Sequence, residues 1–254
     1  MHRQEMKYIY GKKINKSEPQ SLVDQRKIIG NKLNFASREA YKLLRTNLIF
    51  SMCDEDKCKI IGITSALRGE GKSTTAINLA YSLAEANQKT LLIEADMRLP
   101  LVHRLLQLDK TVGLSNVLAG VAKLEDAVRH GILLYTLSVL PSGDIPPNPS
   151  ELLSSSRMKN IISKLSEEYD YIIIDLPPVT AVSDGLAIAN LLSGMLVVVR
   201  HDYCDRRALA AAMQQMDFLK VKILGFVMNC KERQRKKRDR YYSKYRYSSA
   251  YKPV

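Results

Sequence analysis

The stretch K-I-I-G-I-T-S-A-L-R-G-E-G-K-S-T, from Lys59 to Thr74, decides the fold. Its β-branched start predicts a buried strand over 59–64, and its end predicts a helix over 72–86. The turn between them nearly matches the phosphate-binding pattern G-x-x-x-x-G-K-[ST], with Ala66 in place of the first glycine. A strand, a glycine-rich turn and a helix in this order predict a phosphate-binding loop.

The residue types of this loop suit a nucleotide. Glycines let the backbone turn tightly and aim its N–H groups at phosphate oxygens, and the following helix adds its positive N-terminal end. Lys72 can reach the β- and γ-phosphates of ATP, and Ser73 can ligate Mg²⁺. We therefore predict ATP and Mg²⁺ as cofactors, in a site made of Gly69, Glu70, Gly71, Lys72, Ser73 and Thr74.

Carboxylates follow two other predicted strands. The run Y-I-I-I-D ends in Asp175, which fits a Walker B residue near Mg²⁺. The run L-L-I-E-A-D-M-R-L-P carries Glu94 and Asp96, which strand alternation places on one side. These two could bind Mg²⁺ and take a proton from an incoming hydroxyl. The alternative is a strand-end cap, with Arg98 in a surface ion pair.

The rest of the chain continues this alternation and predicts an α/β domain of the P-loop NTPase type. Short β-branched runs separated by helices are typical of a mostly parallel sheet covered by helices on both faces, with its ligand at the carboxyl ends of the strands. We expect strands over 90–93, 137–140, 171–174, 195–199 and 223–228, and helices from Ser37 and over 101–107, 114–118, 157–168, 184–192 and 206–219. The domain should span 35–230, between a loosely ordered polar arm, 1–34, and a disordered tail, 231–254.

Composition narrows the class of protein. Of 254 residues 46% are hydrophobic and 26% charged, as in soluble globular proteins. No apolar run approaches the roughly 20 residues of a membrane span, and the start lacks a signal peptide, so we expect a cytoplasmic protein. Four cysteines in this spacing indicate neither a disulfide framework nor a zinc site. Most of the net charge of +13 lies in the tail, where ten Lys or Arg face two acidic residues.

Several motifs together resemble the bacterial tyrosine kinases (BY-kinases) of capsule and exopolysaccharide systems. These are R-E-A-Y-K-L-L-R-T-N, the phosphate loop, A-D-M-R-L-P, G-L-S-N-V-L-A-G, P-P-N-P-S-E-L-L, I-I-I-D-L-P-P and a terminal tyrosine cluster. The resemblance implies an ATP-dependent autokinase that regulates polysaccharide synthesis. It implies catalytic residues Lys72, Glu94, Asp96 and Asp175, with Ser73, Asp96 and Asp175 at the metal. The base that deprotonates the tyrosine is Glu94 or Asp96, and Glu94 stands where the family usually has Asp.

The same resemblance implies partners. The family's oligomer motif, Glu-x-x-Arg-x-x-Arg, corresponds to Glu39, Lys42 and Arg45, which implies a homo-oligomeric ring. Without a membrane span the chain is similar to the split type, whose partner is a membrane-spanning activator, or chain-length determinant, that holds the kinase at the inner face of the membrane. A cognate tyrosine phosphatase and polysaccharide-pathway enzymes as substrates are further implied partners.

The tail carries the expected phosphoacceptors, Tyr241, Tyr242, Tyr245, Tyr247 and Tyr251. A flexible tail of 24 residues would reach roughly 25–30 Å, enough to enter a neighbouring copy's site. Five phosphotyrosines would add roughly −7.5 to −10 charges and cancel the tail's +8. Basic and aromatic residues could instead bind nucleic acid, which we do not expect beside a kinase-like core. The main alternative is a partitioning or division-site ATPase, but its signature lysine is replaced here by Leu67.

Overall fold

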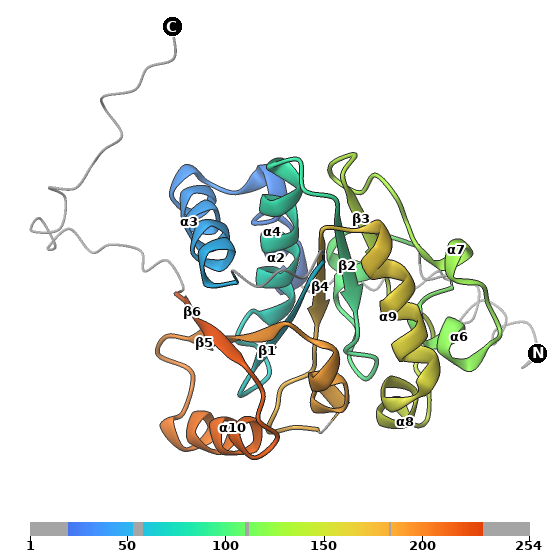
Figure 1. Cartoon of the computed structure of the whole chain (residues 1–254). Coiled ribbons are helices and arrows are strands. Elements are labelled where there is room, and N and C mark those ends of the chain that lie inside the picture. The colour runs from blue at the N-terminus through green and yellow to red at the C-terminus, as the bar shows by residue number, and fades with distance from the viewer. Residues whose placement is uncertain (1–19, 53–57, 110–111, 183, 231–254) are drawn as a thin grey trace, which may run out of the picture.

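A six-stranded parallel sheet forms the centre of the computed structural model, which describes residues 20–52, 58–109, 112–182 and 184–230 (Figure 1). The strand order is β3-β2-β4-β1-β5-β6, so β1 and its phosphate loop lie in the middle. The predicted α/β P-loop fold is confirmed. The strands are β1 Lys59–Ser65, β2 Thr90–Glu94, β3 Leu137–Leu140, β4 Tyr171–Asp175, β5 Gly194–Arg200 and β6 Ile223–Asn229.

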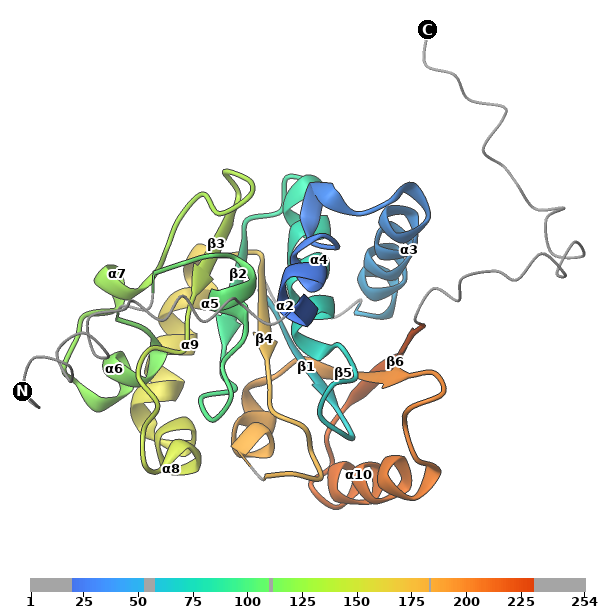
Figure 2. The same ribbon diagram turned by 180° about the vertical axis from the view of Figure 1, so that it is seen from behind.

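Helices cover both faces of this sheet, because the inner strands are apolar on both sides. One face carries α2 Gln20–Arg26, η1 Gly30–Lys32, α3 Phe35–Ser51, α4 Lys72–Glu85 and α5 Val102–Leu105. The other carries α6 Leu114–Ala119, α7 Leu124–Ala127, α8 Pro149–Ser154, α9 Ser156–Glu168, η2 Asp184–Leu191 and α10 Arg206–Phe218. Figure 2, seen from behind, shows α3 and α4 together beside the sheet, away from α9.

Parallel register brings the predicted functional residues to one edge of the sheet. Asp175 at the end of β4 is level with Ile63 of β1 and with Glu94 of β2. The phosphate loop leaves β1 two residues later, so the loop and both strand-end carboxylates share the carboxyl edge. This is the edge at which ligands bind in open α/β sheets.

The prediction of a loosely ordered arm over residues 1–34 is wrong for residues 20–34, because these residues fold against the domain. Three apolar side chains of this segment, Leu22, Ile29 and Leu33, are buried. The amide side chain of Asn78 on α4 accepts a hydrogen bond from the Gly30 N–H and donates one to the carbonyl of Ile28. Isolated apolar residues without a helical period gave no sequence signal for this packing. Residues 1–19 lie outside the described residues.

Smaller differences concern helix ends and type. α3 begins at Phe35, because the Asn34 side chain accepts a hydrogen bond from the Ser37 amide. The helix expected over 184–192 is a 3₁₀ helix, and α7 and α8 were not expected. Across the described ranges, no helix has the length and apolar character needed to span a bilayer.

Candidate active site

The phosphate loop adopts the backbone that its glycines permit. Gly69 has φ +79° and Gly71 has φ +94°, both in the left-handed region that other residues disfavour. Gly71 caps α4, and Lys72 and Ser73 form the first turn of that helix. Within the part of the chain that the structure describes, no acceptor pairs with the amides from Gly69 to Thr74. These N–H groups at a helix N-terminus suit a phosphate.

Glu70 lies in this loop but its side chain points inward. The carboxylate is fully buried and accepts hydrogen bonds from the Leu67 amide at 2.7 Å and the Arg200 amide at 3.2 Å. Burial and a hydrogen bond to this carboxylate raise the pKa of the Cys204 thiol to about 11, so the thiol stays protonated. Of the predicted nucleotide-binding residues, Glu70 can therefore offer phosphate only its backbone N–H, because its carboxylate braces the loop.

Neighbouring strands brace the loop from outside as well. Asn229, at the end of β6, donates to the Glu70 carbonyl at 2.9 Å, and Arg200, at the end of β5, donates to the Gly69 carbonyl at 3.0 Å. From the segment after β4, the Thr180 hydroxyl donates to the carbonyl of Ala66. No motif marked these residues, although each lies at the end of a strand, or shortly after one, at the same edge of the sheet.

Lys72 lies among the predicted carboxylates. Its Nζ is 2.8 Å from Asp96 Oδ2, 3.5 Å from Asp175 Oδ1 and 3.4 Å from the hydroxyl of Ser73. Burial opposes the charge of Lys72, but the attraction of Asp175 and Asp96 outweighs it and raises the pKa of Lys72. The structure thus brings together four of the residues that the sequence singled out.

Asp175 has one carboxylate oxygen left over. Burial raises the pKa of Asp175 to about 6, because the charge of Lys72 and a hydrogen bond from Ser73, which lower this pKa, are weaker effects. Its Oδ2 atom is buried, and among the described residues it has no hydrogen-bond partner. An orphaned carboxylate oxygen beside a serine hydroxyl fits Mg²⁺ or its water shell. The described ranges hold no group of three or more His, Cys, Asp or Glu in a metal-binding arrangement, so phosphate and water oxygens would complete the coordination.

Glu94 and Asp96 make separate sets of hydrogen bonds, although, in addition to burial, the charges of both act on Asp175 and raise its pKa. Asp96 contacts Lys72 and accepts from the Leu99 amide at 3.1 Å. Glu94 accepts instead from the amides of Val102 and Ser142. The chain leaves β2 at Glu94, so alternation no longer governs Asp96.

Arg98 holds the other side of this segment. Its guanidinium donates to both carboxylate oxygens of Asp184, at 2.6 and 3.1 Å, and the Ser150 hydroxyl donates to the same carboxylate. Asp184 is buried, so Arg98 pairs with an interior carboxylate and not in the surface ion pair that the alternative interpretation proposed. Burial alone would raise the pKa of Asp184, but hydrogen bonds from Arg98 and Ser150 lower it below its ordinary value.

Comparison with known proteins identifies the family. A family model described as an AAA domain matches residues 58–222. The chain is 42% identical over 76% of its length to tyrosine-protein kinase YwqD of Bacillus subtilis, covering 81% of that protein. It is 39% identical over 80% of its length to tyrosine-protein kinase CpsD of Streptococcus agalactiae, covering 87% of it. The chain belongs to the bacterial tyrosine-protein kinases.

Solved structures agree with the assignment of this chain to the bacterial tyrosine-protein kinases. The kinase domain of Escherichia coli ETK matches with a TM-score of 0.76 and 32% identity, over 83% of this chain and 82% of that one. The septum site-determining protein MinD of Pyrococcus horikoshii, complexed with Mg-ADP, has a TM-score of 0.58 and 28% identity, over 68% of this chain and 70% of that one. This division-site protein therefore shares the P-loop fold with the kinase, while the two sequence relatives named above are tyrosine-protein kinases.

The predicted oligomer residues of the kinase lie on α3. Glu39 and Lys42 form an ion pair at 2.9 Å with half-exposed side chains. Arg45 makes its hydrogen bonds within the same chain, because its guanidinium donates to the carbonyl and the hydroxyl of Ser82 on α4. Glu39 and Lys42 remain available to a second copy, and the interface stays a prediction. The predicted phosphoacceptors Tyr241 to Tyr251 lie outside the described residues.

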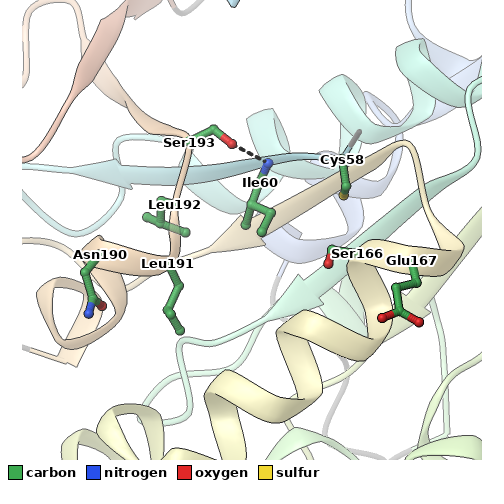
Figure 3. A pocket seen from close by; sticks show the side chains of 8 residues that line it. All are labelled: Cys58, Ile60, Ser166, Glu167, Asn190, Leu191, Leu192 and Ser193. Carbon is green, nitrogen blue, oxygen red and sulfur yellow. Dashed lines mark hydrogen bonds between the residues drawn. The ribbon is translucent and has the colours of Figure 1, made fainter. Parts of the chain in front are cut away.

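A surface pocket of about 490 Å³ lies away from this site (Figure 3). It is lined by Cys58 and Ile60 at the start of β1, Ser166 and Glu167 at the end of α9, and residues 190–193 before β5. Because parallel strands run in one direction, the starts of β1 and β5 lie at the sheet edge opposite the phosphate loop. The pocket is therefore not part of the nucleotide site of the kinase.

Proposed function

We propose that this kinase transfers the γ-phosphoryl group of ATP to the tyrosines of the C-terminal tail of a neighbouring copy. The observation that carries the proposal is the grouping of Lys72, Asp96 and Asp175 beside the phosphate loop. It supplies a cation for the phosphates, a carboxylate for the metal and a second carboxylate for a proton. Five tyrosines within the last fourteen residues supply the acceptors.

Asp96 is the proposed base. The tyrosine hydroxyl gives its proton to a carboxylate oxygen of Asp96, its oxygen forms a bond to the γ-phosphorus, and the bond from that phosphorus to the β–γ bridging oxygen breaks, which leaves ADP. Lys72 would turn from Asp96 to the phosphates, which frees this carboxylate for the proton. Ser73 and Asp175 would hold Mg²⁺, which neutralises charge on the transferred group when bound.

The proposed context is the control of capsular or extracellular polysaccharide. Support comes from the family resemblance, from relatives named CpsD and CapB, and from the matching structure of the chimerical protein CapA2B2. We propose that a membrane-spanning activator docks on this chain and holds it at the membrane, that copies assemble through α3, and that a tyrosine phosphatase reverses the reaction.

A mixing experiment tests transfer between copies. A variant with all five tail tyrosines changed to Phe keeps its nucleotide site but has no acceptors in its tail. It is incubated with Mg·ATP and a Lys72→Met chain that keeps its tyrosines. Mass spectrometry should find phosphotyrosine in the Lys72→Met tail of the mixture, and none when that chain is incubated alone. A control mixture adds Lys72→Met to the five substitutions in the first chain and should give no phosphotyrosine.

Two results would overturn the proposal. Wild-type protein that hydrolyses ATP without any phosphotyrosine, with or without the cytoplasmic segment of its activator, would favour an ATPase switch. Phosphotyrosine that forms in wild-type chains but never in the mixture would restrict transfer to a single copy. Measuring oligomer size before and after full phosphorylation adds an independent readout, since the modification should cancel the tail's basic charge and loosen the assembly.

A further inference from the structure

Glu94 is a buried carboxylate whose two oxygens are both occupied. It is 0% exposed. Its Oε1 accepts a hydrogen bond from the Val102 amide at 2.5 Å, and its Oε2 accepts one from the Ser142 amide at 3.1 Å. The Nδ1 atom of His103 lies 3.3 Å from Oε2. A carboxylate in this setting satisfies amides that would otherwise be buried without an acceptor.

The hydrogen bonds of Glu94 join the two ends of one segment, and they also join this segment to a distant part of the chain. Residues 95–101 connect β2 to α5, and Glu94 and Val102 flank this connection on either side. Their hydrogen bond therefore closes the segment into a loop. Ser142 follows β3, so the same carboxylate fastens the loop to the neighbouring strand's end.

Asp96 is the residue whose position this arrangement sets. It lies inside the closed loop, one side-chain oxygen accepting from the Leu99 amide and the other 2.8 Å from the Lys72 ammonium. Releasing the ends of the loop would let Asp96 move relative to Lys72. Displacement of a reacting group by about 1 Å is enough to cost a reaction about 100-fold.

We propose that Glu94 is a positioning residue for the kinase reaction: it closes segment 95–101 so that Asp96 stays beside Lys72, and it serves neither as base nor as magnesium ligand. This inference rests on the proposed role of Asp96 as the base. Glutamate suits the task because its extra methylene group, compared with Asp, extends its reach to the start of α5. Taking a tyrosine proton would place an O–H group against a donating amide, which removes an acceptor from that amide.

The test uses full-length chains carrying Glu94→Gln, Glu94→Asp or Asp96→Asn. Glu85→Gln, at an exposed position on α4, is the matched control. For each chain we would measure tyrosine phosphorylation against pH, Mg²⁺-dependent ADP binding, and amide hydrogen exchange in segments containing residues 95–102 and 142. Exchange and ADP binding can be read even for a chain with no kinase activity.

If Glu94 positions Asp96, both Glu94 variants lose about 10-fold in kcat, keep the acid limb of the pH profile, and exchange these amides faster. Asp96→Asn loses about 100-fold or more and the acid limb, with slow exchange kept. The double variant Glu94→Gln, Asp96→Asn is no slower than Asp96→Asn alone, because the first change acts through the second residue. Mg²⁺-dependent ADP affinity is unchanged by either Glu94 substitution.

Two results overturn the inference. Glu94→Gln that loses the acid limb while exchange stays slow makes Glu94 the base. A loss of about 10-fold or more in Mg²⁺-dependent ADP affinity, again with slow exchange, makes it a metal ligand. An inactive wild-type chain would refute the proposed function instead, and faster exchange in the Glu94 variants would then still support the closed loop. If Glu94→Gln fails to fold, Glu94→Asp gives the same readouts.

Discussion

The carboxylate of Asp175 should destabilise the protein when no nucleotide is bound. Its environment raises its pKa from 3.8 to about 6, chiefly through burial. Between these values the folded chain binds a proton more tightly than the unfolded chain, so stability falls as pH rises from about 4 to about 6 and stays lower above. A pKa difference of about 2.2, at about 1.36 kcal/mol for each pKa unit, amounts to at most about 3 kcal/mol at pH 7.

The substitution Asp175→Asn tests this reasoning, because Asn keeps the shape of the side chain without its charge. The nucleotide-free variant should be more stable than wild type at pH 7.5 by up to about 3 kcal/mol, which raises the Tm by about 6–12 °C. The gain should shrink towards zero near pH 4, where the wild-type carboxyl is also neutral. Kinase activity should be lost together with Mg²⁺-dependent nucleotide binding.

Thermal unfolding followed by circular dichroism between pH 4 and 8 measures the effect. Asp217→Asn, at an exposed position on α10, is the matched control and should change stability by less than about 0.5 kcal/mol at each pH. A variant less stable than wild type at pH 7.5 would mean that the attraction of Lys72 outweighs burial. An equal gain at pH 4 and pH 7.5 would show that ionisation of Asp175 is not its cause.

Three other substitutions follow from the site. Gly71 has φ +94°, and a Cβ added there would lie 2.1 Å from the side-chain amide nitrogen of Asn229. The affinity of Gly71→Ala for a fluorescent ATP analogue should therefore fall by about 100-fold or more. Ser73→Ala should abolish the increase in ADP affinity that Mg²⁺ gives, measured by calorimetry, while metal-free binding persists. Arg98→Ala leaves the buried Asp184 carboxylate with Ser150 as the remaining side-chain donor among the described residues. This substitution should lower the free energy of unfolding in urea at pH 7 by about 1–3 kcal/mol.

Each of these three has its own control. Gly131 has a comparable φ of +69°, but no atom lies within 4 Å of a Cβ added there. The affinity of Gly131→Ala for nucleotide should therefore be unchanged. Thr74→Ala alters the hydroxyl next to Ser73 and should leave the Mg²⁺ effect intact. Arg68→Ala removes an exposed arginine. If it destabilises the chain as much as Arg98→Ala does, the ion pair between Arg98 and Asp184 is not the cause of the destabilisation.

The strands and the phosphate loop could be predicted because their signals are local. Short β-branched runs give the parallel strands, and strands that run in one direction bring Lys72, Asp96 and Asp175 to one edge. The roles of Glu70 and Glu94 could not be predicted in this way. Glu70 contacts the Arg200 amide 130 positions along the chain, and Glu94 contacts the Ser142 amide 48 positions away. Such contacts depend on loop paths, which leave no periodic pattern in the sequence.

The same limit explains the segment 20–34. Its buried side chains are single apolar residues in a polar stretch, and Asn78, the residue that anchors it, lies 48 positions from Gly30 on the inner surface of α4. A periodic pattern reports an element that packs along its whole length. It does not report a segment held by a few separate contacts.

The pairing of Lys72 with Asp96 and Asp175 links nucleotide and metal binding. Without nucleotide, the ammonium partly compensates two buried carboxylates. Phosphates that attract Lys72 would leave both carboxylates beside further negative charge, in a buried setting where such repulsion is strong. A divalent cation held by Ser73 and Asp175, as proposed above, would compensate the charges of phosphate and carboxylate together. On the proposed mechanism, nucleotide without Mg²⁺ would therefore meet an electrostatic penalty that Mg·ATP does not, and Lys72 would leave Asp96 most readily when Mg·ATP has bound.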